Sequence, residues 1–128
     1  MDFIRPVLLT VAFLGGSALA QEASNQYEGN WSGDCGVPVD LEIHGQAGKW
    51  TPHANKGITK NNPCAAYAKP VAVQTATAER LVISVNGSAA LQGCADVKMA
   101  FRASDATHLE IVRAPGATVN YECILSRR

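Results

Sequence analysis

Apolar and polar residues alternate with a period of two along most of the chain beyond residue 26. The clearest runs cover residues 37–44, 81–86 and 96–102, where every second residue is apolar. Such alternation is typical of a β-strand that buries one face and exposes the other. Apart from a single turn expected at 65–68, no stretch has apolar residues at helical spacing over an adequate length. The pattern therefore predicts an all-β protein.

Eight short strands are predicted, each bounded by residues that favour turns. They cover about residues 27–33, 37–44, 48–53, 70–77, 80–86, 96–102, 107–113 and 118–125. Tight turns join most of them, so neighbouring strands must run antiparallel. We expect a small antiparallel up-and-down β-barrel, because closure leaves no open strand edge. A two-sheet sandwich fits the same pattern and is the alternative.

Residues 1–20 have the features of a secretory signal peptide. Arg5 supplies a positive charge, residues 7–14 form a short apolar run, and a small-x-small cleavage motif ends at Ala20. The apolar run is too short to cross a bilayer, so we expect no stable membrane insertion. Taking these 20 residues from 128 leaves 108, the length of one domain. We therefore expect a single secreted or periplasmic domain over 21–128.

Four cysteines follow the leader, and an exported chain is expected to join them in two disulfides. They are Cys35, Cys64, Cys94 and Cys123. Topology favours Cys64–Cys94, because these residues flank the hairpin of the fourth and fifth strands. Cys35–Cys123 then links the first and last strands of a closed barrel; Cys35–Cys64 with Cys94–Cys123 is the alternative pairing. A zinc site made of all four lacks the close C-x2-C spacing, so no metal is expected.

The balance of charge argues against a nucleic-acid partner. The 11 basic and 11 acidic residues give a net charge of zero, so no global field attracts nucleic acid or an anionic membrane. The charges are segregated, however: residues 21–48 carry five acids and no lysine or arginine, and residues 49–78 carry four lysines and no acid. Mutual neutralisation of neighbouring strands explains this split. The alternative is that the lysines form a basic loop that binds an anionic partner.

The one long connection, residues 54–69, is the expected recognition element. Connections of this length are uncommon in compact domains and are often functional. A disulfide at Cys64 would restrict the loop before binding, and such preorganisation improves affinity. The candidate partner-binding residues are Lys56, Lys60, Asn61, Asn62 and Tyr67.

No arrangement of residues predicts a catalytic site. Asp40 and His53 are expected to face each other across a hairpin, with Ser32 as the nearest nucleophile, but there is no Gly-x-Ser-x-Gly motif. His44 and His53 are expected roughly 13 Å apart at the rise of a strand, too far to share a metal ion. We therefore expect no enzyme activity and no cofactor.

The strand and turn pattern resembles that of the avidins, in particular bacterial dimeric members with a loop-to-loop disulfide. The similar features are Trp31 in the first strand, a glycine turn before Gly48-Lys49-Trp50, the loop Asn61-Asn62-Pro63-Cys64, and the strand 81–86 followed by Gly93-Cys94. The resemblance covers about residues 27–102 and implies an avidin-like or lipocalin-like barrel. Both tryptophans precede position 51, so the later tryptophans with which avidins contact biotin have no counterparts. Biotin is therefore not the expected ligand.

The expected function is that of a non-enzymatic secreted binding protein, monomeric or weakly dimeric, which acts through its disulfide-pinned loop. An inhibitor of an extracellular enzyme is one such protein. The first alternative is a carrier with a small apolar ligand in the barrel mouth near Trp31 and Trp50, and the second is a structural envelope protein. The predicted interior is mostly Val, Leu and Ile, which favours a filled barrel over an open one.

Overall fold

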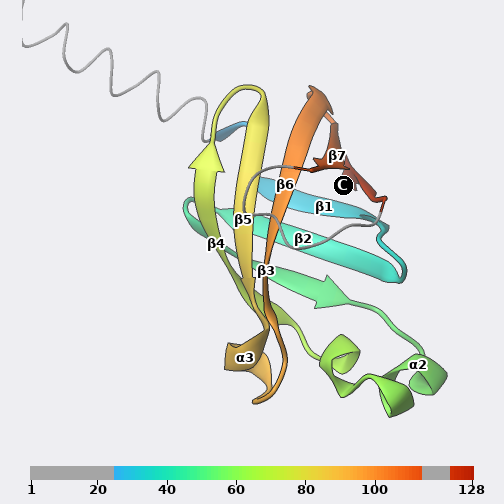
Figure 1. Cartoon of the computed structure of the whole chain (residues 1–128). Helices are drawn as coiled ribbons and strands as arrows, with labels where there is room; N and C mark the ends of the chain where they lie inside the picture. Colours follow the sequence, from blue (N-terminus) through green and yellow to red (C-terminus); the bar gives the residue numbers. More distant parts are fainter. Residues whose placement is uncertain (1–24, 114–121) are drawn as a thin grey trace, which may run out of the picture.

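The computed structural model describes residues 25–113 and 122–128, and its strands form a closed antiparallel barrel (Figure 1). The strands are β1 (Gly29–Asp34), β2 (Pro38–His44), β3 (Ala47–Pro52), β4 (Lys69–Ala76), β5 (Arg80–Asn86), β6 (Asp96–Asp105), β7 (His108–Val112) and β8 (Ile124–Arg127). Three short helical segments lie between strands of this described part: α2 (Lys56–Asn61), η1 (Pro63–Ala66) and α3 (Gly87–Ala90).

Closure of the barrel comes from the pairing of its first and last strands. Each strand pairs with the next along the chain, and β1 also pairs with β8. Trp31 on β1 therefore lies opposite Leu41 on one side and opposite Arg127 on the other. The predicted up-and-down barrel is confirmed, and the alternative sandwich is wrong. The last strand was expected at 118–125; β8 begins at Ile124, and positions 118–121 lie outside the described residues.

The connection between β3 and β4 contains helical structure that the sequence pattern did not predict. Asn55 caps α2, because its side-chain oxygen accepts a hydrogen bond from the Ile58 backbone N–H at 3.0 Å. Helix α2 buries none of its residues, so it leaves no apolar stripe from which a helix could be predicted. The single turn expected at 65–68 appears slightly earlier, as η1.

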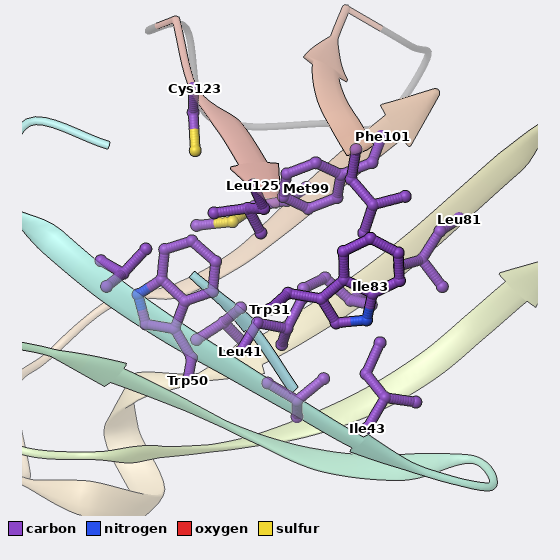
Figure 2. Close-up of a cluster of buried hydrophobic side chains, with 14 of the residues drawn as sticks. Trp31, Leu41, Ile43, Trp50, Leu81, Ile83, Met99, Phe101, Cys123 and Leu125 are labelled. Carbon is purple, nitrogen blue, oxygen red and sulfur yellow. The ribbon is translucent and has the colours of Figure 1, made fainter. Parts of the chain in front are cut away.

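The inward residues of the strands form one continuous apolar core (Figure 2). Leu41, Leu81, Leu109 and Leu125 are 0% exposed, and each lies on the predicted inward phase of its strand. The two tryptophans belong to the same core, with Trp31 1% and Trp50 5% exposed. The alternation in the sequence therefore identified the buried face correctly along the described strands.

One end of the barrel is capped by residues 25–28. These residues contact the turns of the β2–β3 and β4–β5 hairpins: the Glu28 carboxylate accepts a hydrogen bond from Gly45 N–H, and the Tyr27 hydroxyl donates to the Thr77 carbonyl at 2.5 Å. Arg127 holds the cap in place by donating to the Glu28 carbonyl at 2.6 Å. Burial raises the pKa of the Tyr27 hydroxyl.

Trp31 lies beneath this cap. Its indole N–H donates to the Tyr27 carbonyl at 3.0 Å, and the guanidinium carbon of Arg127 lies 4.2 Å from the ring centroid. The arrangement is that of a cation–π contact. Large aromatic side chains and hydrogen-bonded backbone therefore close this end of the barrel.

The opposite end of the barrel carries both disulfides. Cys35 lies between β1 and β2 and is bonded to Cys123, which lies just before β8. Cys64 lies in the β3–β4 connection and is bonded to Cys94 in the β5–β6 connection. The favoured pairing is thus confirmed, and the alternative pairing is wrong. Figure 1 shows α2 and α3, which belong to the two connections joined by the second disulfide, at the same end of the barrel.

Candidate functional site

A pocket of about 390 Å³ opens at the disulfide end of the barrel. Its walls come from the ends of β2, β3, β4, β5 and β6 and from the β1–β2, β3–β4 and β5–β6 connections. The lining residues are Cys35, Val37, Val39, Trp50, Pro52, Asn62, Cys64, Ala65, Lys69, Val85, Cys94, Ala95, Val97 and Met99. We call this hollow the mouth pocket.

Several of the inward residues around the mouth pocket are small, although Trp50 and Met99 also line it. Val39, Val85 and Val97 occupy positions that face the interior near the rim. At the capped end, the comparable space is filled by the larger Tyr27 and Trp31, each 1% exposed. A barrel of eight strands has room for a single ligand only where its interior side chains leave space. The interior is therefore filled at the capped end, and a pocket opens at the mouth.

Both disulfides contribute to the rim of the mouth pocket. Cys35, Cys64 and Cys94 are lining residues. The Cys64–Cys94 bond ties the β3–β4 connection to the β5–β6 connection, and Cys35 is tied to Cys123 just before β8. A covalent tie reduces the conformations open to a loop before any ligand arrives, which lowers the entropic cost of binding. The mouth pocket is therefore preorganised on the side of the β3–β4 and β5–β6 connections.

Lys69 is the polar feature of the pocket that the sequence analysis missed. It begins β4 directly opposite Trp50 on β3. Directly paired residues of adjacent strands point to the same side of a sheet, and Trp50 is buried in the core, so Lys69 lies on the inward phase. The clue in the sequence was its spacing of two from Val71, which is also inward and 4% exposed.

The ammonium group of Lys69 is fixed by backbone carbonyls. Its Nζ donates to the Cys64 carbonyl at 2.6 Å and to the Tyr67 carbonyl at 3.2 Å. Partial burial lowers the pKa of Lys69 from its ordinary value, because the charged form loses hydration. An ammonium group has three donors, so these two bonds leave one donor for another acceptor.

The five candidate residues of the long connection separate into two groups. All five are exposed: Lys56, Lys60, Asn61, Asn62 and Tyr67. Of these, only Asn62 lines the mouth pocket. The others lie on the outer surface of the segment. Ile58, which the sequence analysis did not select, is 39% exposed on the same helix as Lys56 and Lys60, and Tyr67 is 45% exposed. The segment therefore offers an apolar and basic outer surface as well as a wall of the pocket.

Asp40 is the centre of a polar cluster on the outside of the barrel. Ser32 donates a hydrogen bond to its Oδ1 at 2.5 Å, and the Nε2 atom of His53 lies 2.7 Å from its Oδ2. Arg128 also approaches Oδ1, at 3.3 Å. The hydrogen bond from Ser32, then that of His53, and the charge of Arg128 lower the pKa of the Asp40 carboxyl group.

The predicted contact between Asp40 and His53 is confirmed, although the register differs from the expected one. Thr51, rather than His53, lies opposite Asp40. The order of hydrogen bonds also differs from a nucleophilic triad, in which histidine lies between the serine and the acid. Here the acid lies between Ser32 and His53, so the imidazole is not placed to take the serine proton.

A second hollow, of about 430 Å³, lies beside this cluster on the outer surface. Its lining residues are polar or charged and of both signs: Asn30, Asp40, Glu42, Lys49, Thr51 and Arg128. Glu42 faces Lys49 across the β2–β3 hairpin, so opposite charges already lie side by side. This explains part of the charge segregation in the sequence as neutralisation between adjacent strands.

Residues 25–113 and 122–128 contain no group of three or more His, Cys, Asp or Glu side chains placed to hold a metal ion. Within the same residues, no helix has the length and hydropathy needed to span a membrane.

No family model matches the chain, and no curated protein or solved structure is similar to it at a significant level. The closed eight-stranded antiparallel barrel agrees with the architecture that the avidin or lipocalin resemblance implied. Neither family is shown for this chain by these comparisons.

Proposed function

We propose that this protein is a non-enzymatic binding protein that takes a small apolar ligand into the mouth pocket. The observation that carries the proposal is a preorganised apolar hollow of about 390 Å³ at the open end of the barrel. Ligand sites are concave, mostly apolar, and commonly between about 300 and 1,000 Å³ in volume. The lining of the mouth pocket has this character, with Trp50 and four valines on its walls and few polar groups.

Two fluorescent probes with the same aromatic body test this proposal. N-phenyl-1-naphthylamine is neutral, and 1-anilinonaphthalene-8-sulfonate adds one sulfonate group. We expect saturable binding of one probe molecule per chain, and we expect Val97→Phe to abolish it, because Val97 lines the pocket and a phenyl ring there fills the space. Ile58→Phe is the matched control, since Ile58 is an exposed residue outside the pocket lining. Saturable binding of neither probe, or equal binding to the Val97→Phe variant, would overturn the proposal.

Capture of a partner protein by the outer surface of residues 54–69 is a second candidate function, which includes inhibition of an extracellular enzyme. The exposure of Ile58 and Tyr67 beside Lys56 and Lys60 favours it. Large apolar side chains within a basic surface suit a partner with acidic and apolar residues.

A pull-down from the extracellular or periplasmic fluid of the native host distinguishes protein capture from small-ligand binding. The triple variant Lys56→Ala, Lys60→Ala, Tyr67→Ala should lose the captured protein, because it removes the charge and the aromatic contact together. A control triple variant on the far strands, Arg80→Ala, Arg102→Ala, Ile124→Ala, should retain it. Capture that is equal in both variants would contradict the role of this segment.

We also propose that the chain works in the periplasm or outside the cell. The features of residues 1–20 and the two disulfides support this location, because disulfides persist in oxidising compartments. Mass spectrometry of the native protein should find Gln21 as the first residue. A mature protein that retains Met1 would contradict the cleavage.

A further inference from the structure

We propose that Lys69 makes the mouth pocket selective for apolar molecules that carry one anionic group, such as a small aromatic or aliphatic carboxylate or sulfonate. This inference rests on the proposed ligand-binding function of the pocket and names the class of ligand. The observation behind the inference is that a single ammonium group lies on the inward face of the barrel at the rim of the pocket.

The composition of the pocket lining isolates this charge. Among the lining residues, Lys69 alone has a charged side chain. Apart from the disulfide-bonded cysteines, Asn62 is the other lining residue with a polar side chain. No acidic side chain lines the pocket, and no carboxylate pairs with Lys69 in the described part of the chain. A partly buried charge without a counter-ion is costly, and a bound anion would offset that cost.

The geometry of Lys69 suits such a role. Two of its three donors are satisfied by the Cys64 and Tyr67 carbonyls, which hold the ammonium in place. Cys64 is itself fixed by its disulfide to Cys94, so the position of the charge does not depend on a free loop. The remaining donor can form a charge-assisted hydrogen bond to an anion, which is stronger than a bond between neutral groups.

The surrounding sequence favours the approach of an anion. Residues 43–78 contain no aspartate or glutamate, whereas Lys49, Lys56, Lys60 and Lys69 all lie within them. Two of these lysines, Lys56 and Lys60, lie on the segment that forms part of the rim of the pocket, whereas Lys49 faces Glu42 on the outer surface. Clustered charge of one sign raises the local concentration of the opposite charge and speeds association.

The same two probes measure the selectivity directly, since they differ by one sulfonate. We expect the wild-type protein to bind 1-anilinonaphthalene-8-sulfonate at least tenfold more tightly than N-phenyl-1-naphthylamine. Lys69→Met keeps the length and apolar stem of the side chain and should remove the preference while leaving the affinity for the neutral probe within a few fold. Lys69→Arg should retain the preference. Lys60→Met removes an exposed charge outside the pocket lining and should weaken the preference only slightly, because solvent and salt screen that charge.

The outcomes separate this inference from the function on which it rests. Equal affinity of the wild-type protein for the two probes would overturn the role of Lys69 and leave the apolar pocket intact. An equal fall in affinity for both probes in Lys69→Met would show that Lys69 only supports the loop, which also overturns the inference. If neither probe binds the wild-type protein, the proposed function itself fails.

Discussion

Removal of the Cys64–Cys94 disulfide tests how the mouth of the barrel is held. The perturbation is the double substitution Cys64→Ala, Cys94→Ala. These residues are 30 positions apart in sequence, and in the chain-entropy description a closed loop of that length stabilises the fold by about 3.6 kcal/mol at 25 °C. In the corresponding variant of Cys35 and Cys123, which are 88 positions apart, the free energy of unfolding should fall by about 4.6 kcal/mol. Removing the disulfide that closes the longer loop should therefore destabilise the fold by about 1 kcal/mol more.

Urea unfolding followed by tryptophan fluorescence measures both losses. Trp31 and Trp50 are 1% and 5% exposed in the folded protein, so unfolding transfers both rings to water and shifts their emission. We expect the dependence of the free energy of unfolding on urea concentration to steepen in both variants. The reason is that an unfolded chain without the cross-link is less compact and exposes more surface.

The order of the two losses decides whether the reasoning is right. A loss below about 1 kcal/mol for the Cys64 and Cys94 pair would refute the entropic argument, because the mouth would then be held by other contacts. So would a larger loss for this pair than for Cys35 and Cys123, since loop length predicts the opposite order. Wild-type protein treated with reductant provides the control, and it should be less stable than either variant because it lacks both disulfides.

Three further predictions concern the rest of the barrel. Gly48→Ala should lower the free energy of unfolding by about 2 kcal/mol or more, because its new Cβ would overlap a backbone carbonyl of β2. Gly57→Ala on the exposed helix α2 should change it by less than about 1 kcal/mol, because the gain in helix propensity is opposed by a tight contact with the capping oxygen of Asn55 at 3.3 Å. Urea unfolding of both variants checks this. The hydrogen bond from Ser32 lowers the pKa of Asp40, so this carboxylate stabilises the fold above its ordinary pKa of 3.8 and the stabilisation is lost as the pH falls through the lowered value. Asp40→Asn should flatten that part of the stability–pH curve, and an unchanged curve would contradict the assignment. Arg127→Met removes the charge-assisted hydrogen bonds to the cap and the contact with the buried indole of Trp31. We expect the free energy of unfolding to fall by about 2 kcal/mol and amide hydrogen exchange at residues 25–28 to become faster.

Much of the fold could be predicted from the sequence because each strand carries its own signal. In 37–44, the alternation of Val, Leu and Ile with polar residues fixes which side chains face inward, and the structure buries Val39, Leu41 and Ile43 as expected. The same information favoured the disulfide pairing that the structure shows, although it left a second pairing open. Once neighbouring strands are joined by short turns, the connections that hold Cys64 and Cys94 must lie at one end of the barrel.

The short helix α2 and the true start of β4 were missed for a local reason. A helix of six residues that buries no side chain has no apolar face, so its cap at Asn55 was its only signal. Lys69 was assigned to the long connection, and a lysine seldom occupies an inward position of a strand. Its pairing with Trp50 is visible only when the register between β3 and β4 is known.

The sequence by itself determined the inward faces of the strands, because these depend on local periodicity. It favoured a closed barrel and the observed cysteine pairs from the lengths of the connections, and the structure decided both against their alternatives. Only the tertiary structure decided which end is plugged and which is open. That difference depends on the volumes of the side chains that several strands place at the same height along the barrel axis. The stagger between neighbouring strands sets which residues share a height, and no single strand encodes that stagger. The same stagger brings Lys69, Asn62 and the small inward valines to one rim, and it places Asp40 between Ser32 and His53 on the outer wall.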